Sequence, residues 1–236
     1  MVESIHNNEF DQDLLNYLGQ FITDHKKSVI EMVLAKRSRH LTVVLEDIFK
    51  PHNASAVIRT CDCFGLQDIH IIEKTNQYKV NPFVTRGTSQ WIDLHKYYRE
   101  GTNSVDNCFS WLRENGYRIY GTSPSPSSIS IHELQPTEKL ALVFCNEHEG
   151  ISEEVKSKAD GLVQIPMLGF TESFNISVSA SIFLYDLVKK AEKLNLPDFY
   201  LSESEKNTLR MKWYRSLVKN SAIHEKVYLK NISKNQ

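Results

Sequence analysis

The chain has 236 residues, of which 41% are apolar and 24% are charged, and it carries a formal net charge of −1. This composition predicts a globular protein with a sizeable core and excludes collagen-like, low-complexity and largely disordered proteins. No apolar run approaches the roughly 20 residues of a membrane span, and no basic region with an apolar stretch opens the chain, so we expect neither membrane insertion nor a signal peptide.

Residues 1–40 predict a helical N-terminal extension. Apolar side chains recur at helical spacing between residues 9 and 22, and Ile30, Val33 and Leu34 continue an apolar stripe in a second segment. The charge changes sign along this extension. Residues 1–25 contain five acids and no Lys or Arg, whereas residues 26–40 contain five bases and one acid.

Residues 41–195 predict an α/β domain. Short, apolar, β-branched segments indicate strands at 41–45, 69–72, 117–120, 140–144 and 162–166. Helical spacing indicates helices at 54–64, 105–115, 152–159 and 176–190, the first capped by Asn53 and the third by Ser152. Because strands and helices alternate, we expect a mostly parallel sheet flanked by helices.

The last segment, residues 196–236, predicts a basic, amphipathic C-terminal helix. Leu209, Trp213 and Leu217 lie four residues apart, and residues 201–236 carry eight bases against three acids. The basic flanks surround a core, residues 41–200, that carries 15 bases and 20 acids. This segregation is compatible with binding a polyanion, although charge alone favours solvated helix faces.

The four cysteines, Cys61, Cys63, Cys108 and Cys145, lack paired C-x-x-C spacing. This predicts buried, reduced thiols rather than a zinc site or a disulfide framework. We therefore expect a cytoplasmic protein without a bound metal.

Polar side chains collect in the segments that follow the predicted strands, where open parallel sheets bind ligands. No G-x-G-x-x-G follows the first strand and no P-loop motif occurs, which disfavours dinucleotide and P-loop sites. Arg59 lies on an otherwise apolar helix, where it either pairs with Asp62 or another core acid or meets an anion such as an RNA phosphate. Ser173 and Asn175 open the last long helix, and simple capping would also explain them.

Three segments, read together, resemble the motifs of the SpoU-type branch of the SPOUT superfamily of RNA 2′-O-ribose methyltransferases. They are residues 53–60 (NASAVIRT), 144–152 (FCNEHEGIS) and 165–180 (IPMLGFTESFNISVSA). The lead-in to the first motif and the helical extensions are most similar to the TrmH type, which methylates guanosine 18 in the tRNA D-loop. The resemblance covers roughly residues 26–195.

This resemblance implies a fold and a cofactor that local patterns do not reveal. The chain between about residues 140 and 190 would form a deep trefoil knot, in which S-adenosylmethionine is bound. The protein would act on tRNA as a homodimer.

Carried over by position, the resemblance also implies site residues. The catalytic residues would be Arg59, Asn53, Glu147, Ser173 and Asn175. The cofactor would contact Thr122, Cys145, Glu147, Gly150, Ile165 and Phe174, with Cys145 at a position that is usually Gly in the family. Together with the charge pattern, the resemblance suggests RNA contacts by Lys36, Arg37, Arg39, Arg86, Arg210, Lys212 and Arg215.

The function expected is therefore tRNA 2′-O-ribose methylation that depends on S-adenosylmethionine. Two alternatives stay open at this point. One is a sister methyltransferase that modifies ribosomal RNA or another tRNA position, and the other is a non-catalytic RNA-binding relative.

Overall fold

The structure, a computed structural model, describes residues 12–75, 87–98, 103–145 and 150–235. The chain divides into a core unit, Ser38–Tyr200, and a terminal unit that combines Met1–Arg37 with Leu201–Gln236. The sequence predicts two separate extensions, whereas the structure assigns both to this one terminal unit. Among the described residues, no helix has both the length and the apolar character needed to cross a membrane.

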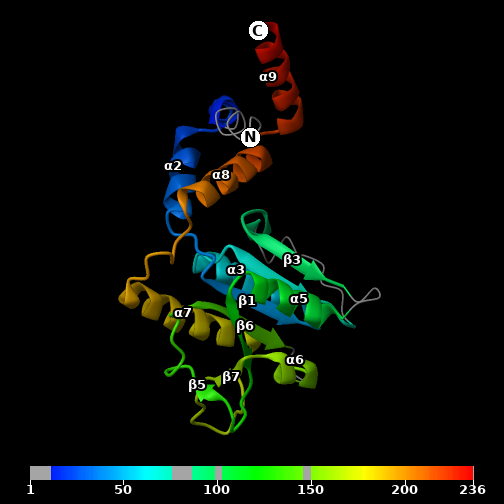
Figure 1. The fold of residues 1–236 in the computed structure, drawn as a ribbon, viewed down its shortest axis with the longest axis vertical. Helices are drawn as coiled ribbons and strands as arrows, with labels where there is room; N and C mark the ends of the chain where they lie inside the picture. Colours follow the sequence, from blue (N-terminus) through cyan, green and yellow to red (C-terminus); the bar gives the residue numbers. More distant parts are fainter. Residues whose placement is uncertain (1–11, 76–86, 99–102, 146–149, 236) are drawn as a thin grey trace. The chain divides into compact units, whose positions relative to one another are not determined.

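The core unit is built on a seven-stranded parallel sheet (Figure 1). In pairing order its strands are β3 (Asp93–Tyr97), β2 (Asp68–Ile72), β1 (Leu41–Glu46), β6 (Lys139–Cys145), β4 (Tyr117–Thr122), β7 (Gly161–Gln164) and β5 (Ile129–Ser130). The predicted parallel sheet is confirmed. The sequence patterns miss β3 and β5, because β3 is a half-buried edge strand rich in polar residues and β5 is only two residues long.

Helices cover both faces of this sheet. The first face packs against α3 (Pro51–Cys63) and α7 (Ile176–Leu194), and the second against α5 (Ser104–Glu114) and α6 (Glu153–Lys158). A short 3₁₀ helix, η1 (Thr88–Gln90), precedes β3. Neighbouring residues of β1 serve opposite faces, since Val43 belongs to the α3–α7 cluster and Val44 to the α5–α6 cluster. Burial on both faces explains the continuous apolar runs of the central strands.

The start of α3 differs from the sequence prediction. Pro51 lies in the first turn, where its missing N–H is no loss, and Lys50 is the N-cap residue without a side-chain hydrogen bond. Asn53 is therefore a buried residue inside the helix, and the prediction that it caps the helix is wrong. The prediction for Ser152 is confirmed, because its side chain accepts a hydrogen bond from the backbone N–H of Val155 at the start of α6.

The terminal unit is helical. It contains a helix within residues 12–19, α2 (Asp24–Leu34), α8 (Glu203–Leu217) and α9 (Ser221–Asn235), so the sequence prediction of one C-terminal helix is incomplete. Trp213 of α8 is 1% exposed, and the guanidinium carbon of Arg37 lies 5.5 Å from its ring centroid. Arg210 of α8 pairs with Glu31 of α2 through two hydrogen bonds, at 2.6 and 2.7 Å.

The cysteines only partly follow their prediction. Cys61 and Cys108 are buried, as expected, and none of the four cysteines, all of which lie in the described parts of the chain, forms a disulfide. Cys63 is exposed at the end of α3 and Cys145 is half-buried at the end of β6, so the prediction of burial is wrong for these two.

A ring cluster on the α5 side of the sheet holds a neutral histidine. His70 is fully buried, stacks on His95 with ring centroids 4.7 Å apart, and forms a 3.0 Å hydrogen bond between its Nδ1 and the hydroxyl of Tyr97. Burial, assisted by the nearby His95, lowers the pKa of His70 from 6.5 to about 3. The folded core therefore keeps His70 uncharged well below neutral pH.

Acid is expected to weaken the core unit through this residue. Between the two pKa values the unfolded chain binds a proton that the folded chain excludes, so the free energy of unfolding falls as the pH falls. Between pH ~8 and ~5 the wild type should lose about 2 kcal/mol of unfolding free energy through His70. We expect the unfolding free energy of His70→Gln to fall by that much less over the same pH range. Urea denaturation at both pH values measures this difference. An equal loss in wild type and variant would contradict it.

Candidate active site

A cavity of about 280 Å³ lies at the carboxyl ends of β4, β6 and β7. This is the edge at which a parallel sheet binds ligands. Five of the six residues expected to contact the cofactor line this cavity, namely Thr122, Cys145, Gly150, Ile165 and Phe174. The sixth, Glu147, lies outside the described residues.

The strands fix the walls of this cavity. Thr122 ends β4, and its hydroxyl donates a 2.9 Å hydrogen bond to the carbonyl of Val143 in β6. Cys145 ends β6, packs in part against the core cluster of the α5–α6 face, and still borders the cavity. Gly150 has a φ of +70°, a conformation that a residue with a Cβ rarely adopts. The lining combines apolar residues such as Phe144 with polar residues such as Thr122 and Ser173, which fits a ligand with both apolar and polar parts.

A second, larger hollow of about 1110 Å³ contains Arg59. It is lined by α3, by α7 and by the segment after β7, and Ile165 belongs to the walls of both hollows. Arg59 is exposed, and within the described parts of the chain it forms no ion pair. The alternative that Arg59 pairs with Asp62 is therefore wrong. A guanidinium beside the first cavity is available to an anion that enters from solvent.

Asn53 and Asn175 are 122 residues apart in sequence but lie together. The amide nitrogen of Asn175 donates a 3.4 Å hydrogen bond to the side-chain oxygen of Asn53. The side-chain oxygen of Asn175 accepts from the backbone N–H of Ser177 at 2.9 Å and caps α7. Asn175 thus caps the helix and also joins the first and third motifs, so capping and a role at the site do not exclude each other.

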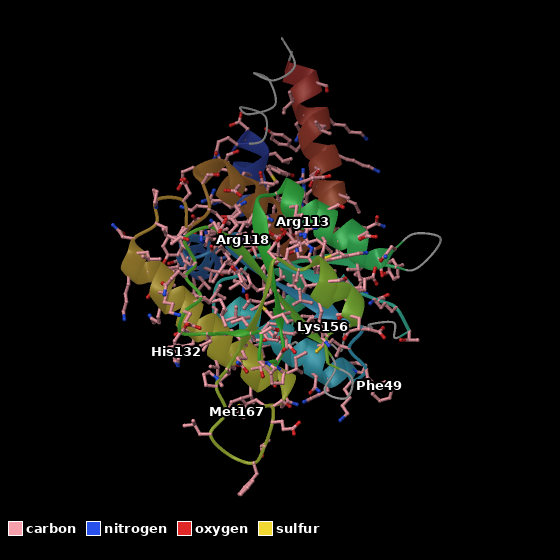
Figure 2. All side chains as sticks on the ribbon, turned by 60° about the horizontal axis from the view of Figure 1, so that its bottom comes forward. Phe49, Arg113, Arg118, His132, Lys156 and Met167 are labelled. Carbon is pink, nitrogen blue, oxygen red and sulfur yellow. The ribbon has the colours of Figure 1, made fainter. Side chains whose placement is uncertain are left out.

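The segment between β7 and α7 carries Ser173 and Phe174 beside the cavity. Figure 2 shows the loop labelled at Met167 projecting away from the sheet. Its Leu168 and Phe170 are fully exposed. This segment contributes residues to the walls of both hollows.

Sequence reasoning missed several residues next to this site. Glu46 ends β1 as a buried carboxylate, Lys74 follows β2, and Ser179 lines the cavity from α7. The signal for Glu46 was present, because an acid directly follows the apolar strand 41–45 and a buried charge needs partners.

The residues expected to bind RNA have different environments. Lys36 and Lys212 are exposed. Arg37 is 1% exposed, so the expectation that it contacts a phosphate is wrong for this structure. Three other arginines already have carboxylate partners: Arg39 with Asp68 and Asp93, Arg210 with Glu31, and Arg215 with Glu225. Arg86 lies outside the described residues.

Comparisons with known proteins agree with these motifs. A family model described as the SpoU rRNA Methylase family matches residues 40–185. A Borreliella burgdorferi protein named tRNA (guanosine(18)-2'-O)-methyltransferase is 47% identical over 89% of this chain and 95% of its own length. A crystal structure described as an A. aeolicus TrmH/SpoU tRNA modifying enzyme superposes with a TM-score of 0.73 at 30% identity, covering 83% of this chain and 98% of that one.

A more distant structure shares the fold alone. It is the SpoU methyltransferase AviRb from Streptomyces viridochromogenes in complex with AdoMet, with a TM-score of 0.58 at 22% identity over 68% of this chain and 64% of that one. The three motifs, the parallel sheet with its cavity and the match over residues 40–185 agree. This chain belongs to the SpoU methylase family.

Proposed function

We propose that this protein is an S-adenosylmethionine-dependent tRNA 2′-O-ribose methyltransferase that modifies guanosine 18 in the D-loop. The observation that carries the proposal is the 47% identity to a tRNA (guanosine(18)-2'-O)-methyltransferase over 95% of that protein's length. The cavity at the strand ends and the neighbouring hollow with Arg59 supply two adjacent sites, as a reaction between a cofactor and an RNA requires.

In this proposal the 280 Å³ cavity binds the cofactor, which supplies an activated methyl group. Ile165 and Phe174 offer apolar surface for its adenine, while Thr122 and Ser173 provide polar contacts. Transfer requires the ribose 2′-oxygen to be aligned with the methyl group and to lose its proton. A 2′-hydroxyl also distinguishes RNA from DNA, so the substrate class follows from the reaction.

Arg59 and the asparagine pair orient the RNA. Arginine keeps its proton in proteins, so we assign Arg59 to binding a phosphate and orienting the ribose rather than to accepting the hydroxyl proton. Asn53 and Asn175 hold the first motif against the start of α7, and thus keep the RNA side of the site next to the cofactor side. Glu147 and Ser173 complete the proposed catalytic group.

Mass analysis of ribonuclease digests tests this function directly. We expect tRNA incubated with the protein and S-adenosylmethionine to gain one methyl group on guanosine 18, and tRNA from cells without the protein to lack it. Methylation of a different tRNA position or of ribosomal RNA would favour a sister enzyme. Cofactor binding without any methylated ribose would favour a non-catalytic RNA-binding protein.

The finer features of the family complete the proposal. We propose the deep trefoil knot between about residues 140 and 190, a homodimer, and action in the cytoplasm, where tRNA is found. Support for the dimer comes from exposed apolar residues on α7 and the preceding loop, among them Leu168, Val178 and Tyr185. Sedimentation that gives a monomer at micromolar concentration would contradict the dimer.

Basic side chains of the terminal unit are proposed to bind the tRNA backbone. Lys36, Lys212 and Lys219 are exposed, so changing them to Gln removes charge without breaking the ion pairs of Arg210 and Arg215. Each lost phosphate contact lowers the slope of log affinity against log salt by roughly one. We expect the triple Gln variant to bind tRNA more weakly with a flatter salt slope and an unchanged affinity for S-adenosylmethionine. If the folded variant keeps the wild-type slope of log tRNA affinity against log salt, these lysines do not contact the tRNA backbone.

A further inference from the structure

A buried carboxylate lies just behind the proposed cofactor cavity. Glu46, the last residue of β1, is 3% exposed, yet it is absent from the cavity wall. Its Oε1 accepts hydrogen bonds from Lys74 Nζ at 2.7 Å and from Ser152 Oγ at 2.5 Å. Its Oε2 accepts from the backbone N–H of Ser152 at 3.1 Å. Both oxygens of Glu46 are thus engaged, and two of the three donors belong to Ser152.

The two partners of Glu46 are also fully engaged. The Ser152 hydroxyl donates to Glu46 and accepts from Lys74 Nζ at 3.0 Å and from the backbone N–H of Val155 at 3.2 Å. This uses its one donor and both acceptor positions. Lys74 also pairs with Glu154 at 3.4 Å, so its ammonium reaches three acceptors. The three groups join the end of β1, the segment after β2 and the start of α6 into one network.

This network holds one wall of the cavity. Glu46 lies opposite Cys145 in the β1–β6 register, and Ser152 follows Gly150 by two residues. Cys145 and Gly150 both line the cavity. Between Gly150 and Ser152, Ile151 is buried against β4, so closely that a Cβ on Gly121 would lie 2.6 Å from its Cδ1. The segment 150–152 is therefore held by Glu46 on one side and by β4 on the other.

We propose that Glu46 is a positioning residue for the methyl donor: through Ser152, and with Lys74, it holds Gly150 at the wall of the cofactor cavity. This inference rests on the proposed function of the cavity. It predicts that the network controls affinity for S-adenosylmethionine rather than for tRNA. A purely structural carboxylate would instead affect only the stability of the fold.

The decisive variant is Glu46→Gln. Its amide nitrogen cannot accept a hydrogen bond, so one of the three donors is left facing another donor. We expect the dissociation constant and KM for S-adenosylmethionine to rise about tenfold or more, with the KM for tRNA unchanged. Ser152→Ala should raise the same two constants, and Ser152→Thr, which keeps the hydroxyl, should restore them. The double variant should be no worse than Glu46→Gln, because both changes act on one segment.

Two controls separate the possible results. Asp68→Asn removes a buried carboxylate at the start of β2, whereas Glu46 lies at the end of the parallel strand β1. Asp68 pairs there with Arg39 and His95. We expect it to lower Tm while leaving cofactor affinity within about twofold. Ser179→Phe places a ring inside the cavity from α7 and should abolish cofactor binding if the cavity is the site.

Calorimetric titration with S-adenosylmethionine, well below each Tm, reads out all variants. If Glu46→Gln is folded and binds within about twofold of the wild type while Ser179→Phe does not bind, the positioning role is overturned and the cavity assignment stands. If Ser179→Phe binds normally, the cavity assignment itself is overturned, and the positioning role with it.

Discussion

Arg59→Ala should lower the rate of methyl transfer to tRNA at least about a hundredfold, because a misplaced ribose loses the alignment on which the reaction depends. The affinity for S-adenosylmethionine should stay within about twofold of the wild type, since Arg59 is not part of the cavity wall. Arg59→Lys should restore little of the rate, because an ammonium cannot reproduce the planar, bidentate fork of a guanidinium.

Single-turnover rates with saturating cofactor measure this effect apart from binding. Arg118→Ala is the matched control: Arg118 is also an exposed arginine, its ion pair is with Glu138, and Figure 2 shows it far from the loop that carries Met167. It should keep the wild-type rate. Turnover of Arg59→Ala close to the wild type would refute the role assigned to this guanidinium.

We expect Trp213→Ala to disrupt the terminal unit. Trp213 is among the largest fully buried side chains of the protein, and truncation of such a residue costs about 3–5 kcal/mol of unfolding free energy. Its ring also lies under the Arg37 guanidinium, and the variant would lose this cation–π contact. We expect residues 201–236 to become sensitive to limited proteolysis and the affinity for tRNA to fall several-fold or more.

The same variant contains its own control. The cavity belongs to the core unit, so calorimetric affinity for S-adenosylmethionine should be unchanged in Trp213→Ala. Loss of cofactor binding would contradict the assignment of separate tasks to the two units. Normal tRNA affinity after proteolysis of the terminal unit would do so as well.

Local hydrophobic pattern predicts the central strands of the sheet but not its edge strands or the first residue of α3. The apolar runs at 41–45 and 140–144 predicted β1 and β6, because strands covered on both faces have no polar alternation. The sequence does not predict β3, because an edge strand of half-buried, mostly polar residues has no continuous apolar run. α3 starts at Pro51 instead of after Asn53, since proline suits the first helical turn and needs no side-chain cap.

The candidate site depended on more than pattern. Spacing alone favoured an ion pair for Arg59, and only the three motifs in order suggested an anion partner. The 3.4 Å contact between Asn53 and Asn175 joins segments 122 residues apart, a relation that periodicity cannot encode. Threading of one segment through another likewise leaves no trace in local spacing, so the proposal of a knot rests on the family resemblance alone. The acid that follows strand 41–45 indicates that Glu46 needs polar partners, but the sequence does not indicate that Ser152 and Lys74 are those partners.

The composition of the terminal unit has a consequence for synthesis at the ribosome. Its two parts are separated by the entire core unit, so α2 leaves the ribosome long before α8 exists. At translation speeds of about 5–20 residues per second, this delay is on the order of ten seconds. During that time α2 lacks α8, the helix that it contacts in the finished protein. The proposed cofactor cavity lies wholly in the core unit, so a nascent chain can complete it before the proposed tRNA-binding unit is assembled.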